Sequence, residues 1–213
     1  MNFLAGKIVL ITAGPTYEKI DPVRFIGNFS SGKMGYAIAE AAAEQGAMVK
    51  LVSGPTHLTV THPNIERFDV LSAEEMYQVC CRLHPESEVS VFCAAVADYT
   101  PKHPFSSKVK RHEDEMTITL VKNKDIAAEL GQKKAAHQVH IGFALETHNE
   151  MANAQGKLAK KNLDYIILNS LQDDKSGFGY DTNKVSIISK DEITALPLMS
   201  KAEVAKAIIQ LLA

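Results

Sequence analysis

GKMGYAIAEAAAEQGAMVKLVSG, residues 32–54, is a helical pattern followed at once by an apolar run. Over 32–46 the apolar residues recur at helical spacing, and Gly46 is well suited to end the helix. The run at 47–54 predicts a buried strand, and KIVLITAG at 7–14 predicts another strand before the helix. A strand, a helix and a strand in this order indicate a parallel sheet with crossover helices.

The same alternation continues along the chain. Helices are predicted at 72–84, 124–135, 147–162 and 201–213, and strands at 89–99, 116–122, 139–146 and 164–170. The runs 184–189 and 193–198 predict a C-terminal β-hairpin. We therefore expect one α/β domain over residues 1–213, with a mostly parallel sheet flanked by helices.

Local signals mark three helix starts. Ser72 with Glu75 and Thr147 with Glu150 have the spacing of capping boxes, in which side chains and backbone amides bond reciprocally. Asn123 is a candidate cap for the helix at 124–135.

Composition excludes several classes of function. The chain has 213 residues, a net charge of −2 and a pI near 6.4, which disfavour nucleic-acid binding. No apolar run approaches the roughly 18 residues of a membrane helix, and the apolar start does not have the form of a signal peptide. The three cysteines and eight histidines lack metal-ligand spacing. Unpaired cysteines are typical of a reduced compartment, so we expect a cytoplasmic protein.

Two long segments have no apolar period. Residues 14–31 contain Pro15 and Pro22, and residues 100–115 contain two further prolines and several basic residues. Long irregular loops in compact domains are often functional, so the second segment is a candidate flap over a site.

GNFSSGKMG, residues 27–35, is one letter short of a phosphate-binding P-loop. That motif needs Ser or Thr where Met34 stands, and it follows a strand directly, whereas the predicted strand ends near Ala13. We therefore exclude a P-loop. The stretch still begins a helix, so the backbone at Ser30–Gly32 can bind an anion without that motif.

A Rossmann-type NAD(P)-dependent oxidoreductase is the main alternative function. The order of elements fits, but AGPTYE at 13–18 replaces G-x-G-x-x-G, and the strand at 47–54 has no acidic residue for a ribose. YDTNK at 180–184 has the Tyr-x-x-x-Lys spacing of short-chain dehydrogenases, yet it precedes a predicted strand instead of lying on a helix. A nucleotide-binding module without catalysis is a second alternative.

Charged residues also follow predicted strand ends, where ligands bind in open α/β sheets. Asp98 ends the strand at 89–99, and Lys108 lies ten residues later in the candidate flap. Lys157 and Lys161 lie one helical turn apart and so share a helix face. Surface lysines are ordinarily just solvated, but placement after successive strand ends favours a functional role for these.

Several stretches in order resemble the phosphopantothenoylcysteine synthetase (phosphopantothenate–cysteine ligase) family. They are ITAGPTYEKIDPVRFIGNFSSGKMG, AAVADY followed at a distance by KVK, VKNKDI, GFALET and KLAKKNLDYIILN. The match runs from about Lys7 to the end of the chain, and its long first motif is specific.

The resemblance implies a Rossmann-like homodimer and a reaction in coenzyme A biosynthesis. 4′-Phosphopantothenate, L-cysteine and CTP would give 4′-phosphopantothenoylcysteine, CMP and pyrophosphate through an acyl-cytidylate, with Mg²⁺ accompanying CTP. The sequence resembles the bacterial, CTP-dependent type. Many bacteria fuse this domain behind a flavin-dependent phosphopantothenoylcysteine decarboxylase, so the chain could be a stand-alone enzyme or one half of such a protein. No flavin is expected in this domain, and no nucleic acid or membrane partner.

The resemblance also implies site residues. Asn28 would act on the acyl-cytidylate, Lys108 would stabilise the developing phosphate charge, and Arg24 and Ala95 would join Asn28 in binding substrate. The residues implied in CTP binding are Asp98, Lys108, Lys124, Asp125, Ile126, Ala127, Phe143, Lys157 and Lys161. The ligands of Mg²⁺ stay unknown from the sequence.

Two stretches depart from the family pattern. Lys124 stands where N-P-D-I is common, which changes little if that position contributes its backbone. The flap, TPKHPFSSKVK, differs in sequence but keeps the spacing to Lys108.

Overall fold

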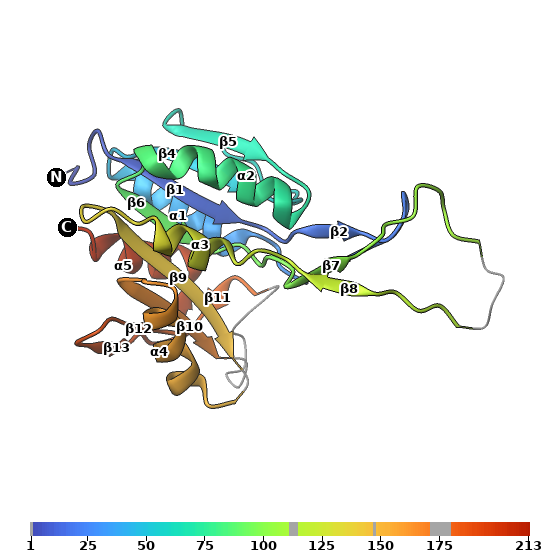
Figure 1. Ribbon diagram of the computed structural model, residues 1–213. Coiled ribbons are helices and arrows are strands. Elements are labelled where there is room, and N and C mark those ends of the chain that lie inside the picture. The colour runs from blue at the N-terminus through green and yellow to red at the C-terminus, as the bar shows by residue number, and fades with distance from the viewer. Residues whose placement is uncertain (1, 111–114, 147, 171–179) are drawn as a thin grey trace.

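An eight-stranded sheet forms the body of the computed structural model, which describes residues 2–110, 115–146, 148–170 and 180–213 (Figure 1). In order across the sheet its strands are β13 (Ile193–Ala195), β12 (Val185–Ile188), β10 (Tyr165–Ser170), β9 (Val139–Glu146), β6 (Val89–Phe92), β1 (Ile8–Ala13), β4 (Met48–Ser53) and β5 (Ile65–Asp69). All neighbours from β5 to β10 are parallel, whereas β12 pairs antiparallel with β10 and with β13. The predicted α/β fold and C-terminal hairpin are confirmed.

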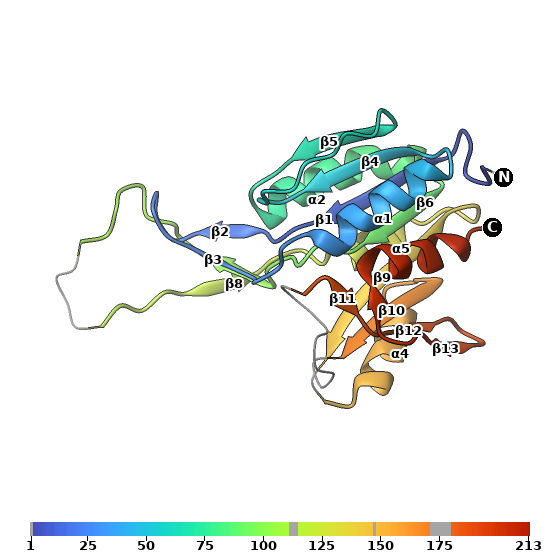
Figure 2. The ribbon, with the colours of Figure 1, turned by 180° about the vertical axis from the view of Figure 1, so that it is seen from behind.

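Helices cover both faces of this sheet. Figure 2 shows α1 (Lys33–Glu44) and α5 (Lys201–Gln210) on one face. On the other face lie α2 (Ala73–Leu83), α3 (Ile126–Gln132) and α4 (Glu150–Lys160), with a short 3₁₀ helix at His84–Glu86 after α2. Each face has its own apolar core, and the central strand β1 contributes to both: Ile11 packs with the first face and Leu10 with the second. Burial on both faces explains why β1 is a continuous apolar run.

The connection between β1 and β4 is the predicted crossover. Gly46 has φ 86° and its amide bonds to the Ala43 carbonyl, so it ends α1 as the sequence predicted. Gly35 faces β1 closely, because a Cβ there would lie 2.6 Å from Ala13 Cβ. Small residues on α1 therefore allow the helix to approach the sheet.

Chain order reverses in the middle of the sheet. From β1 the chain moves outward to β4 and β5, then returns to β6 on the other side and continues to β9 and β10. This is the strand order of a Rossmann-like sheet, and the point between β1 and β6 is where such sheets bind ligands.

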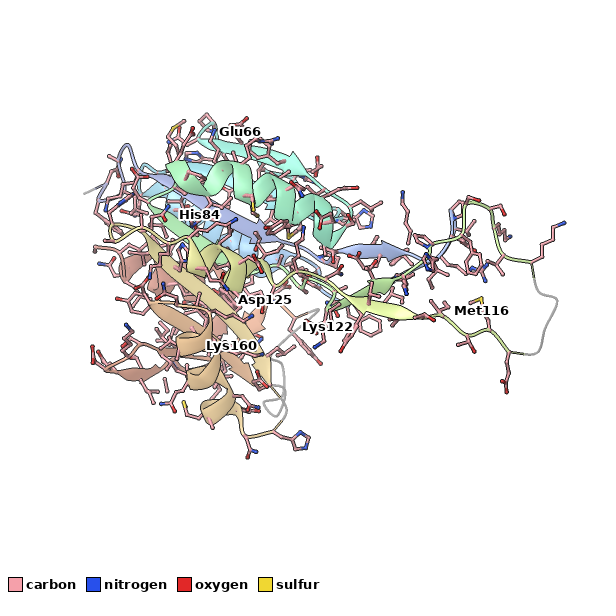
Figure 3. The ribbon with its side chains drawn as sticks, viewed as in Figure 1. Glu66, His84, Met116, Lys122, Asp125 and Lys160 are labelled. Atoms are coloured by element: carbon pink, nitrogen blue, oxygen red, sulfur yellow. The ribbon has the colours of Figure 1, made fainter. Side chains whose placement is uncertain are left out.

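An arm extends from the carboxyl end of the sheet (Figure 1). It comprises β2 (Tyr17–Lys19) paired with β3 (Phe25–Gly27), and β7 (Tyr99–Pro101) paired with β8 (Leu120–Lys122), with β2 lying against β7. Figure 3 places Met116 and Lys122 on this arm and Asp125 where it joins the body. The prediction of an irregular segment at 14–31 was therefore wrong, because β2 and β3 form a hairpin within it.

Other local predictions need correction. β5 was not predicted, and the strand expected at 116–122 is only three residues long and lies in the arm. Asn123 does not cap α3: Asp125 does, by accepting the Ala128 amide. Two shorter strands, β11 (Thr182–Asn183) and β14 (Met199–Ser200), pair beside α5.

The predicted capping boxes are confirmed only in part. The Ser72 hydroxyl accepts the Glu75 amide, but the Glu75 carboxylate accepts from the Leu71 amide instead of the Ser72 amide. Thr147 lies outside the described residues, and α4 begins after Asn149.

Candidate active site

A cavity of about 410 Å³ lies at the carboxyl ends of the central strands. Its walls come from the loop after β6, the ends of β9 and β10, and the starts of α1, α3 and α5. Nine residues predicted for the site line it: Asn28, Ala95, Asp98, Lys124, Asp125, Ile126, Ala127, Phe143 and Lys161. The sheet thus gathers residues from distant parts of the sequence at its switch point.

Two buried threonines hold the loop that forms one wall. Thr12, at the end of β1, accepts hydrogen bonds from the amides of Cys93 (3.1 Å) and Ala94 (3.2 Å). Thr16 accepts from the Ala97 amide at 3.0 Å, and both threonines are at most 2% exposed. The loop after β6 is therefore fixed from the β1 side, which leaves its opposite side facing the cavity.

Asn28 lies against the same loop. Its Nδ2 donates to the carbonyls of Ala95 (3.0 Å) and Val96 (3.3 Å), so two residues predicted to bind substrate are in contact. The turn that follows comes close to the end of β1: a Cβ on Gly32, which has φ 81°, would lie 3.3 Å from Gly14 Cα. Glycine at both positions allows this approach.

The start of α3 forms another wall. Asp125 caps the helix through its Oδ1 and forms an ion pair through Oδ2 with Lys161, at 2.9 Å. The Lys124 side chain points elsewhere, with Nζ 3.1 Å from Glu74 and 4.3 Å from the centre of the Tyr77 ring. Lys124 lines the cavity, while the end of its side chain lies near Glu74 and Tyr77.

Three predicted site residues do not line the cavity: Arg24, Lys108 and Lys157. Lys157 pairs with Glu146 at 2.6 Å, and Lys108 is exposed on the arm. Arg24 forms an ion pair with the buried Asp21 and donates to the Val109 carbonyl at 2.8 Å. Arg24 thus contacts the neighbour of Lys108 instead of the cavity.

Asp21 completes this connection. Its Oδ2 accepts the Val109 amide at 3.1 Å, so Asp21 and Arg24 bind both polar groups of one peptide residue. The Arg24 guanidinium beside Asp21 holds the pKa of that carboxyl well below its usual range. The β2–β3 turn therefore holds the segment that carries Lys108.

The sequence prediction missed several residues of the cavity wall. Lys33, Cys93, Asn169, Asn183 and Lys201 all line it. Burial raises the pKa of Cys93 to about 12, so this thiol is protonated and is not a nucleophile at neutral pH. Among the residues that the structure describes, no three His, Cys, Asp or Glu side chains are grouped to hold a metal ion.

Comparison with known proteins places this geometry in a family. The model of the DNA/pantothenate metabolism flavoprotein C-terminal domain matches residues 4–213. The chain belongs to this family. The resemblance drawn from the sequence motifs is thereby confirmed.

Members of the family with close sequences are longer proteins. The chain is 47% identical over 208 residues to the coenzyme A biosynthesis bifunctional protein CoaBC of Bacillus subtilis, covering 97% of this chain and 51% of that protein. It is 50% identical over 208 residues to a cysteine/cysteine sulfinic acid decarboxylase of an unknown prokaryote, covering 97% of this chain and 58% of the relative. The chain therefore spans little more than half the length of these relatives.

Solved structures of family members share the fold. The crystal structure of the C-terminal domain of a CoaBC protein has a TM-score of 0.84 and 43% identity, covering 99% of this chain and 96% of that one. A Streptococcus pneumoniae DNA/pantothenate metabolism flavoprotein has a TM-score of 0.83 at 23% identity, covering 96% of this chain and 97% of that one, which supports the fold alone. In the described part of this chain, no helix is long and apolar enough to cross a membrane.

Proposed function

We propose that this chain is a ligase of coenzyme A biosynthesis that joins 4′-phosphopantothenate to L-cysteine with CTP. The cavity at the switch point carries the proposal, because it unites nine residues that the synthetase motifs implied. The bifunctional CoaBC relatives, whose names place them in coenzyme A biosynthesis, support the same pathway.

The chemistry needs activation of a carboxylate, since a carboxylate does not react with an amine directly. A carboxylate oxygen of phosphopantothenate attacks the α-phosphorus of CTP, and pyrophosphate leaves with the electron pair of the broken P–O bond. The cysteine nitrogen then attacks the acyl carbon, CMP leaves and the amine loses a proton. Two anions meet in the first step, so positioned cations are the main catalytic requirement.

The chain supplies cations and amide donors for these steps. Lys161 lines the cavity beside the α3 start, where backbone amides suit phosphate oxygens. Asn28 lines the cavity and donates its Nδ2 to the Ala95 and Val96 carbonyls, and we place the acyl group beside it. We assign Lys108 to charge stabilisation at the α-phosphate, which requires the arm to deliver it from outside the cavity.

Mg²⁺ is part of the proposal. Asp98 is exposed and lines the cavity, so its carboxylate fits a cation that is otherwise held by phosphates. Mg²⁺ would neutralise charge on the triphosphate. The absence of a larger acidic cluster among the described residues agrees with an ion that enters with the nucleotide.

We further propose a cytoplasmic homodimer joined through the arm. Phe25, Tyr99 and Leu120 are 49%, 44% and 41% exposed on an element with no core beneath it. Covering these side chains with a second copy would remove apolar surface from water. We also propose that the chain acts with a phosphopantothenoylcysteine decarboxylase, fused or separate, since its relatives are about twice as long.

The test is coupled pyrophosphate release by the 213-residue chain with phosphopantothenate, cysteine, CTP and Mg²⁺. We expect turnover that requires all three substrates, and weak turnover when ATP replaces CTP. Equal or faster turnover with ATP would reject the nucleotide assignment. Binding of CTP without pyrophosphate release would instead favour a non-catalytic nucleotide-binding module.

The name of the decarboxylase relative calls for a second assay. Cysteine and cysteine sulfinate are incubated with the chain, and carbon dioxide is measured. We expect none. Binding of NAD(P)H, followed by fluorescence, tests the oxidoreductase alternative, and we expect none there either.

A further inference from the structure

Asn123 lies where the arm returns to the body of the protein, between Lys122 at the end of β8 and Asp125 at the start of α3 (Figure 3). Its Nδ2 donates to the Ala97 carbonyl at 2.8 Å, and its backbone amide donates to the Asp98 carbonyl at 2.9 Å. Asn123 does not cap α3, so its side chain binds the loop after β6 instead.

These bonds prolong the pairing of β7 with β8. That pairing reaches the body at Tyr99 and Lys122. The amide bond from Asn123 to Asp98 adds the next pair, and the side-chain bond extends the connection to Ala97. Both strands are only three residues long, and a two-stranded ribbon is marginally stable alone. Ala97, Asp98 and Asn123, which we call the arm root, therefore help to fix the direction of the arm.

The arm root also reaches the β1 side of the site through Ala97. The Ala97 amide donates to the Thr16 hydroxyl at 3.0 Å, and its carbonyl accepts from Asn123. Ala97 is only 5% exposed, and a buried carbonyl that loses its donor costs free energy. Thr16 follows β1 and Asn123 precedes α3, so this one peptide residue joins the two sides.

Asn123 connects two walls of the cavity. One wall contains Asp98, in the loop after β6, and the other contains Lys124 and Asp125, at the start of α3. Asn123 is hydrogen-bonded to Asp98 and covalently bonded to Lys124. The Lys124 ammonium is in turn paired with Glu74 on α2, at 3.1 Å. These contacts set the distance between the two walls, and a nucleotide that binds to both depends on that distance.

We propose that Asn123 is a positioning residue, which holds the two walls at the separation that the nucleotide needs and fixes the arm root without touching a substrate. The effect on the nucleotide rests on the proposed function. The fixing of the arm root does not, because it is a property of the free chain.

Hydrogen exchange of the free 213-residue chain tests the arm root. In Asn123→Ala the backbone amides of β7 and β8 should exchange about 10-fold faster than in wild type, the change that corresponds to one lost hydrogen bond. Asn123→Asp should have the same effect, because a carboxylate keeps the shape of the amide but cannot donate.

Gln138→Ala is the matched control. Gln138 is 4% exposed, and its Nε2 donates to the carbonyls of His84 (2.8 Å) and Ser87 (2.7 Å). It directly precedes β9 and so lies at the opposite end of the sheet from the cavity. This variant also removes a side-chain amide from buried carbonyls, yet exchange in β7 and β8 should stay as in wild type.

Ligand binding tests the positioning of the walls. In calorimetric titrations both Asn123 variants should bind CTP about 10-fold more weakly, whereas phosphopantothenate should bind as it does to wild type. KM for CTP should rise by a similar factor, and KM for cysteine should not change. Gln138→Ala should leave all of these values unchanged. A residue that only stabilises the fold would affect the three substrates alike.

Unchanged exchange in β7 and β8 in both Asn123 variants overturns the fixing of the arm root. Faster exchange with unchanged CTP affinity overturns the positioning of the walls, as does an equal loss of CTP affinity in Gln138→Ala. Urea denaturation shows which variants are folded, and Asn123→Asp decides if Asn123→Ala is not. If wild type binds no CTP, the proposed function fails and the positioning of the walls with it, while the exchange measurement still decides the role of Asn123 at the arm root.

Discussion

Replacing Thr12 with valine should destabilise the protein strongly, although valine has nearly the same shape and is more apolar. The Thr12 hydroxyl accepts two amide hydrogen bonds, from Cys93 and Ala94, at the buried end of β1. Each unsatisfied buried donor costs about 1–3 kcal/mol, and these two are partly buried, so we take the lower half of that range. The expected loss is about 2–4 kcal/mol in the free energy of unfolding.

The matched control is Thr12→Ser, which keeps the hydroxyl and loses one methyl group. That change should cost about 1 kcal/mol, the usual effect of deleting a buried methyl. Urea denaturation compares the two variants with wild type, and the valine variant should also melt about 4–16 °C lower. Because the two amides belong to the cavity wall, Thr12→Val should raise KM for the substrates as well. A valine variant as stable as the serine variant would refute the reasoning.

Three further predictions concern the site and the core. Asn28→Asp replaces an amide that donates to the Ala95 and Val96 carbonyls with a carboxylate that cannot donate. Turnover should fall, and the acyl-cytidylate should accumulate and be detected by mass spectrometry. A fall in activity without this accumulation would assign Asn28 to the first step of the reaction. Lys108→Gln, on the exposed arm, should nearly abolish cytidylate formation at unchanged melting temperature, so full activity would remove Lys108 from catalysis. His84 and His140 face each other with Nε2 atoms 2.9 Å apart, and burial lowers the pKa of both, that of His140 to about 3. In the unfolded protein both histidines take up protons below about pH 6.5, so the free energy of unfolding should fall from there toward pH 3. For His140 the fall is up to about 1.4 kcal/mol per pH unit. A series of urea denaturations in which His140→Gln shows the same dependence of stability on pH as wild type would contradict this.

The sheet could be predicted because its strands are buried on both faces. Runs such as 7–14 and 47–54 are mostly apolar, and such runs are typical of parallel strands that are covered on both faces. β5 escaped prediction because IERFD at 65–69 is an edge strand with charged residues on it. The β2–β3 hairpin of the arm escaped prediction because each of its strands is only three residues long, with no core to impose a period.

Residues of the candidate site that lie in contiguous sequence motifs could be predicted. Single residues that only the fold brings to the cavity could not. Asn28, Asp98 and Lys161 came from motifs that recur in order, and the cavity unites them. No local sequence signal indicates that Lys201 lines the cavity, because it is the first residue of an ordinary amphipathic helix. Its Nζ donates to the carbonyl of Tyr180, which lies twenty-one residues earlier in the sequence.

The contacts between the β2–β3 turn and the flap, which we call the clasp, have a consequence for protein engineering. Asp21 and Arg24 hold Val109 across more than eighty residues of sequence, and the Phe105 amide bonds to the Ile20 carbonyl in the same clasp. A chimera that exchanges the flap without the β2–β3 turn would remove the contacts of Asp21 and Arg24 with Val109, the neighbour of Lys108. The two segments therefore form one structural unit, and a chimera or a library should exchange them together.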